Sequence, residues 1–86
     1  MHFEFEAAKS KANSEKHGID FEQAQMLWSD SDALVIPSRY ASEPRKLLIA
    51  KREGKLWTAI YTERGDAVRI ISVRRSRDNE RHSYYE

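Results

Sequence analysis

The chain has 86 residues, of which 34% are charged and 40% hydrophobic, and its formal net charge at pH 7 is +1. This length allows one modest core, so we expect a single domain over residues 1–86. The near-neutral charge argues against bulk electrostatic binding of long nucleic acid, and the absence of cysteine excludes disulfides and thiolate chemistry.

The start of the chain predicts a short strand and then a helix. Residues 1–5 indicate the strand, with Phe3 and Phe5 sharing one side of the extended backbone. Residues 6–17 are mostly strong helix formers, and Gly18 follows where a left-handed C-terminal cap belongs. This stretch has no apolar run long enough for a signal peptide or a membrane span, so we expect a cytoplasmic protein.

A second helix is predicted directly afterwards. Asp20 is its N-cap, Gln23 lies three residues later in a box-like relation, and the helix should end near Ser29. The two helices then form a hairpin. After a polar break, residues 33–36 indicate a short buried strand that ends at Pro37.

The second half of the chain predicts strands joined by short turns. Residues 38–44 are the loosest part, and residues 77–86 indicate a C-terminal helix with Ser76 as its cap. We therefore expect an α+β fold, in which the helical hairpin packs on an antiparallel sheet of about four strands and a short C-terminal helix follows. The three late strands are expected over residues 46–52, 56–62 and 67–73.

Arginines in and after the last predicted strand are candidates for binding phosphate. Guanidinium is planar and always charged, and it grips phosphate with two parallel hydrogen bonds. Arg69 is the most informative, because an unpaired charge inside an apolar strand is costly, so a carboxylate or a ligand must meet it. The alternative for all of them is a half-solvated strand whose arginines pair with neighbouring carboxylates.

Two other groups carry candidate chemistry. Lys16 and His17 join a cation and an imidazole that titrates near neutrality, which suits proton transfer, although a lone surface histidine is more often idle. Near the C-terminus, Arg81 and Tyr84 could stack an unpaired base, or the tyrosine could dock its helix on the sheet. The histidines lack the spacing of a metal motif, so we expect neither a metal nor another cofactor.

Two motifs of the sequence are unusually specific: Lys16-His17-Gly18, and the strand from Arg69 to Arg74 with the sequence Arg-Ile-Ile-Ser-Val-Arg. Further motifs are Phe3-Glu4-Phe5, Lys9, Asn13, Ile19, Phe21-Glu22-Gln23-Ala24, Tyr61-Thr62-Glu63-Arg64-Gly65, Glu80-Arg81 and Tyr84. In order and spacing, over nearly the whole chain, these motifs resemble the BrnT toxin family. Mild departures from the family pattern fall at Glu6, Val73 and Ser76.

The resemblance implies a RelE-like fold and a toxin of a type II toxin-antitoxin system. It implies RNA cleavage without a metal, inhibition of translation, and neutralisation by a BrnA-like antitoxin with a ribbon-helix-helix domain, through which operator DNA is contacted indirectly. Assembly as a homodimer or as a heterotetramer stays open, and the alternative function is a non-catalytic subunit of a DNA-binding autorepressor complex. The expected catalytic residues are Lys16, His17, Arg64, Arg69 and Arg74, and the expected RNA-binding residues are Arg75, Arg81 and Tyr84.

Overall fold

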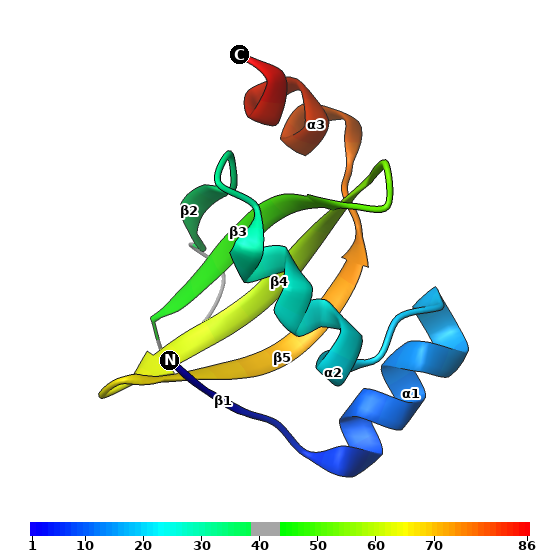
Figure 1. Ribbon diagram of the computed structural model, residues 1–86, viewed down its shortest axis with the longest axis vertical. Helices are drawn as coiled ribbons and strands as arrows, with labels where there is room; N and C mark the ends of the chain where they lie inside the picture. The colour runs from blue at the N-terminus through cyan, green and yellow to red at the C-terminus, as the bar shows by residue number, and fades with distance from the viewer. Residues whose placement is uncertain (39–43) are drawn as a thin grey trace.

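The structure, a computed structural model, describes residues 1–38 and 44–86 and has an α+β architecture (Figure 1). Its sheet has five strands in the order β1-β5-β4-β3-β2. The strands are β1 (His2–Glu4), β2 (Leu34–Ser38), β3 (Arg45–Arg52), β4 (Lys55–Arg64) and β5 (Ala67–Arg75). The helices are α1 (Ala7–His17), α2 (Phe21–Ala24), the 3₁₀ helix η1 (Gln25–Ser29) and α3 (Asp78–Tyr85).

The sheet corrects the expectation of about four antiparallel strands. The predicted strand at the start of the chain exists, and β1 pairs with β5 in parallel, so that the sheet is mixed. Phe3 lies opposite Val68 in this pairing and packs against the core, with its ring 5.1 Å from that of Trp28. The aromatic side of β1 therefore joins it to the sheet edge.

The predicted helical hairpin also needs correction in its second half. The first helix ends as expected, with Gly18 at φ 80°, and the Asp20 capping box with Gln23 is present. The second α-helix, however, has only four residues and continues as η1. Phe21, Ala24 and Leu27 are all buried at a spacing of three residues, which a 3₁₀ turn stacks on one face.

Smaller corrections concern the strand and helix ends. β2 runs through Pro37 to Ser38, because β2 is an edge strand and the missing proline N–H needs no partner there. The cap of α3 is Arg77 and not Ser76, which is buried and bonded to Thr58 at 2.8 Å. Of the segment predicted to be loosest, residues 39–43 lie outside the described residues.

The two faces of the sheet differ in what covers them. In Figure 1, α2 and the segment after it cross the near face of the sheet, and α1 lies beside β5. We call this the covered face. Its core contains Leu48, Ala50, Trp57, Ala59, Tyr61, Val68, Ile70 and Val73, packed against Ile19, Phe21, Ala24 and Leu27. Of the elements in residues 1–38 and 44–86, α3 lies over one end of the other face, which we call the open face.

A β-bulge decides which side chains of β5 reach each face. Ser72 pairs with Ile60 and Ile70 pairs with Tyr61, so that Ile71 has no partner in the β4–β5 register. One extra residue reverses the alternation of side chains beyond it. Residues on the two sides of Ile71 are therefore on the same face when their numbers differ by an odd amount.

Candidate functional site on the open face

The bulge brings three predicted site residues to one face of the sheet. Arg69 pairs with Thr62 and Arg74 pairs with Thr58, and both threonines alternate onto the open face of β4 together with Arg64. The two arginines of β5 are therefore separated by roughly 13 Å along this face. The structure thus aligns Arg64, Arg69 and Arg74 along the open face.

A cleft of about 420 Å³ lies at the Arg74 end of this row. Leu47 and Ile60 supply its apolar surface, and Arg45, Arg74 and Arg77 supply cations. Arg77 is exposed and makes no ion pair within the described part of the chain. The lining residues are Ser38, Arg45, Leu47, Ile60, Arg74, Arg77, Asn79 and Glu80.

Arg74 is held in the cleft by a two-pronged ion pair. Its Nη1 donates to Glu80 Oε1 at 2.8 Å, and its Nη2 donates to Glu80 Oε2 at 2.9 Å. Nη1 also donates to the carbonyl oxygen of Arg75 at 3.3 Å. The Arg74 side chain is 20% exposed and that of Glu80 is 6% exposed, so the pair faces the cleft mainly through the arginine.

The Glu80 carboxylate accepts further hydrogen bonds besides those from Arg74. Its Oε1 accepts hydrogen bonds from Thr58 Oγ1 at 3.0 Å and from the backbone N–H of Arg77 at 2.8 Å. Burial by itself would raise the pKa of Glu80, but the hydrogen bonds from Arg74, Arg77 and Thr58 lower it to about 2. The side chain is therefore a carboxylate at any physiological pH.

Arg69 meets carboxylates, which was one of the two alternatives for a charge in this strand. Its guanidinium lies 3.3 Å from Glu6 Oε1 and 4.0 Å from Glu4 Oε1, and the side chain is 29% exposed. These contacts tie β5 to β1 and to the start of α1. Arg64 lies at the exposed tip of the β4–β5 hairpin and forms no ion pair among residues 1–38 and 44–86.

Lys16 and His17 lie at the edge of the sheet and not in the cleft. Asn13 fixes α1 to this edge, because its side chain donates to Val73 O at 2.9 Å and accepts from Val73 N at 3.1 Å. His17 follows one helical turn later, on the same side of α1. The structure brings neither residue among those that line the cleft.

The remaining predicted RNA contacts lie elsewhere. Arg75 is one residue beyond Arg74, and its guanidinium lies 5.5 Å from the centre of the Trp57 ring. Arg81 donates to Ser76 O at 2.7 Å, which secures the first turn of α3. Arg74, Arg75 and Arg81 thus have different partners, and of these three only Arg74 lines the cleft.

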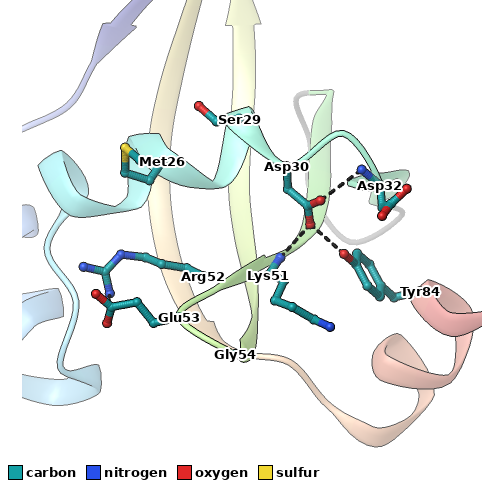
Figure 2. A pocket seen from close by; sticks show the side chains of 9 residues that line it. All are labelled: Met26, Ser29, Asp30, Asp32, Lys51, Arg52, Glu53, Gly54 and Tyr84. Atoms are coloured by element: carbon teal, nitrogen blue, oxygen red, sulfur yellow. Dashed lines mark hydrogen bonds and ion pairs between the residues drawn. The ribbon is translucent and has the colours of Figure 1, made fainter.

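Tyr84 anchors α3 to the rest of the fold, which was the alternative to stacking on an RNA base. Its hydroxyl donates to Asp30 Oδ2 at 2.7 Å, which together with burial raises the pKa of Tyr84 to about 12. Figure 2 shows the same carboxylate accepting hydrogen bonds from the backbone N–H groups of Lys51 and Asp32. These residues line a second pocket of about 570 Å³ with Met26, Ser29, Arg52, Glu53 and Gly54.

The sequence does not single out Arg77, Glu80 or the apolar pair Leu47 and Ile60 as site residues. The available signal was a glutamate three residues after the N-cap of the last helix and six residues after Arg74. This spacing allows the carboxylate to cap the helix and to reach back to the strand. Its partners depend on the sheet register, which the sequence does not supply.

Within residues 1–38 and 44–86, no cluster of three or more His, Asp or Glu side chains could hold a metal ion. None of the helices in this described part is long and apolar enough to cross a membrane.

Comparison with known proteins identifies the family. A search of curated proteins found no significant match to the chain. A family model described as "Ribonuclease toxin, BrnT, of type II toxin-antitoxin system" matches residues 5–80. The matched range contains the arginine row and the cleft, from Ser38 to Glu80. An antitoxin partner and an RNA substrate follow from this description. The chain belongs to the BrnT family of ribonuclease toxins of type II toxin-antitoxin systems.

Proposed function

We propose that this chain is a metal-independent, RelE-like endoribonuclease that cuts RNA on the open face of its sheet and thereby inhibits translation. The observation that carries this proposal is the alignment of Arg64, Arg69 and Arg74 on one face, with a cleft at Arg74. Fixed guanidinium groups in a partly desolvated cleft stabilise negative charge that develops during cleavage. The family supplies the reaction class, and the arginine row supplies a place for it.

The proposed reaction is attack of a ribose 2′-oxygen on the adjacent phosphorus, with breakage of the bond from phosphorus to the 5′-oxygen. The 2′-hydroxyl loses a proton, and the departing 5′-oxygen gains one. Among the described residues that line the cleft, Glu80 is the only carboxylate, and a pKa of about 2 makes it a poor base. We therefore keep Lys16 and His17, at the neighbouring sheet edge, as the proposed proton carriers.

The dimensions and surface of the cleft favour single-stranded RNA. A volume of about 420 Å³ is in the range of small-ligand sites and leaves no room for a duplex. Leu47 and Ile60 offer apolar contact to an unpaired base while Arg74 and Arg77 reach its phosphate. Arg75, Arg81 and Tyr84 stay proposed contacts for RNA that extends beyond the cleft.

The proposed partner is a BrnA-like ribbon-helix-helix antitoxin that covers the open face and carries the complex to operator DNA, in the cytoplasm. Such a partner would silence the toxin by occupying the arginine row. Edge pairing with β2 is a weaker route, because that strand is short and contains Pro37. Occlusion of the open face predicts that substrate RNA and antitoxin compete for the toxin.

Expression with and without the antitoxin tests the function. We expect the free toxin to slow growth and to generate new RNA ends carrying 5′-hydroxyl groups, with cleavage of purified RNA unaffected by EDTA. Arg74→Ala should greatly weaken these effects and leave a residual rate of cleavage, whereas Lys11→Ala on the exposed side of α1 should retain them. Intact RNA and normal growth would instead identify a non-catalytic subunit of a repressor complex.

Separate variants test the individual roles. His17→Ala and Arg69→Ala should each slow cleavage of purified RNA. Wild-type rates for both variants would remove them from the site and restrict it to the cleft.

A further inference from the structure

The ion pair of Arg74 uses only part of the guanidinium. This group has five N–H donors: one on Nε and two on each Nη. Glu80 takes one hydrogen from Nη1 and one from Nη2, and the carbonyl of Arg75 takes the second from Nη1. The hydrogen on Nε and the second hydrogen on Nη2 remain.

These two remaining donors lie side by side on one edge of the planar group. They form a second fork, which lies in the same plane as the one that binds Glu80 but faces another direction, and its spacing suits two oxygens of a phosphate. Within the described part of the chain Arg74 Nε has no hydrogen-bond partner, and it is not among the buried polar atoms that lack one. The free edge is therefore accessible from the cleft that Arg74 lines.

Glu80 is itself fixed, so it can fix the arginine. The residue is 5% exposed, and its carboxylate is held by Thr58 Oγ1 and by the N–H of Arg77 at the start of α3. Thr58 in turn bonds Ser76 at 2.8 Å. A carboxylate held from strand and helix leaves the bound guanidinium little freedom to turn.

We propose that Glu80 is a positioning residue, which presents the Nε–Nη2 edge of Arg74 as a two-pronged binding site for one phosphodiester group of RNA. Arg77, which has no ion pair among the described residues, adds a second cation beside it. This inference rests on the proposed ribonuclease function. The alternative is a purely structural role, in which Glu80 only attaches α3 to the sheet and does not affect how Arg74 binds phosphate.

Steady-state cleavage of a short RNA separates the two roles. Glu80→Gln should lower kcat by between tenfold and a hundredfold with little change in KM, because the variant loses the fixed orientation of a group that acts in the transition state. Glu80→Asp keeps the charge and should lose less. The matched control is Glu86→Gln on the same helix, whose carboxylate pairs only with the exposed His82 among the described residues and whose loss should change nothing.

The double variant gives the decisive comparison. If Glu80 acts through Arg74, the kcat of Glu80→Gln with Arg74→Ala should equal that of Arg74→Ala alone. If instead the fold-loss of kcat in the double variant equalled the product of the two single losses, Glu80 would act independently of Arg74, and the proposal would be overturned.

A binding measurement keeps this inference separate from the cleavage hypothesis. RNA with 2′-O-methyl riboses cannot be cut by the proposed reaction, and its binding can be followed through the ¹⁵N-edited signal of Arg74 Nε–H. Addition of this RNA should shift the signal in the wild type, shift it less in a folded Glu80→Asp variant, and leave it unchanged in a folded Glu80→Gln variant. An equal shift in all three proteins would refute positioning, whereas uncut natural RNA with a shifted signal would refute only the ribonuclease proposal.

Discussion

The covered and open faces of one sheet have opposite compositions, although the same strands supply both. β5 sends Val68, Ile70 and Val73 into the core on one side, and Arg69 and Arg74 to the other. The covered face is sealed by helices, whereas the open face carries guanidinium groups with carboxylate partners at its two ends. A chain this short can thus keep one side of its sheet for stability and the other for binding.

The comparison depends on one residue. If Ile71 were paired in a regular ladder, Arg69 and Arg74 would lie on opposite faces, because their numbers differ by five. Because of the bulge, β5 keeps its aliphatic side chains on the covered face and its arginines Arg69 and Arg74 on the open face, both before and after Ile71. The predictions below break or sharpen this division, starting with the largest effect.

Insertion of one alanine between Ile60 and Tyr61 should abolish folding. The insertion gives Ile71 a partner, and the resulting regular β4–β5 ladder would turn Val68 and Ile70 toward the open face and bury the charge of Arg69; each buried aliphatic side chain is worth about 1.5–3 kcal/mol. We expect no cooperative thermal transition by circular dichroism. Deletion of Ile71 also removes the bulge but keeps every other side chain of β5 on its face, so that variant should melt cooperatively; cooperative melting of both variants would mean that the bulge does not decide the faces.

Truncation of matched aliphatic residues compares the stability of the faces directly. Leu27→Ala removes a side chain that is fully buried on the covered face and should cost about 2–5 kcal/mol in urea denaturation. Ile60→Ala on the half-buried open face should cost less than half of that. Equal losses would mean that the open face also belongs to the core.

The pH dependence of unfolding reports the ion pair of the open face. Glu80 has a folded-state pKa of about 2, below the ordinary 4.5, so its stabilisation is complete above pH 4.5 and is lost as the pH falls toward 2. The loss should reach about 3 kcal/mol. Glu80→Gln should be less stable near neutral pH and should lack this acid-dependent step, which urea titrations between pH 2 and 6 would reveal.

Arg69→Ala should change activity more than stability. Its pairs with Glu4 and Glu6 are partly solvated, so the free energy of unfolding should fall by at most about 1 kcal/mol. Cleavage should slow about tenfold because one cation leaves the arginine row. A large loss of stability with unchanged cleavage would assign Arg69 to the attachment of β1 alone.

The smallest effect is expected at the docking point of α3. Tyr84→Phe removes the hydrogen bond to Asp30 and should lower the free energy of unfolding by about 1 kcal/mol without changing cleavage, since the ring is retained. Because the pKa of Tyr84 is raised to about 12, its contribution is present below pH 10 and is lost as the pH rises through 12. The free energy of unfolding should therefore change less between pH 8 and pH 11.5 in Tyr84→Phe than in the wild type.

Much of the local structure was predictable because it depends on neighbouring residues. Gly18 ends α1 and the Asp20 box starts α2, as the spacing of those residues indicates. The late strands and the terminal helix appear at the expected places within a few residues. The parallel pairing of β1 was not predictable, because β1 meets a strand more than sixty residues away.

The sequence by itself determined the family, the α+β class and the presence of arginines in a mostly apolar last strand. Only the tertiary structure decided that Arg64, Arg69 and Arg74 share a face, that Glu80 orients Arg74, and that Lys16 and His17 lie at the sheet edge. The physical reason is range: helix caps and strand patterns act over a few residues. A bulge and an ion pair between strand and helix depend on the register of segments that meet only in the folded chain.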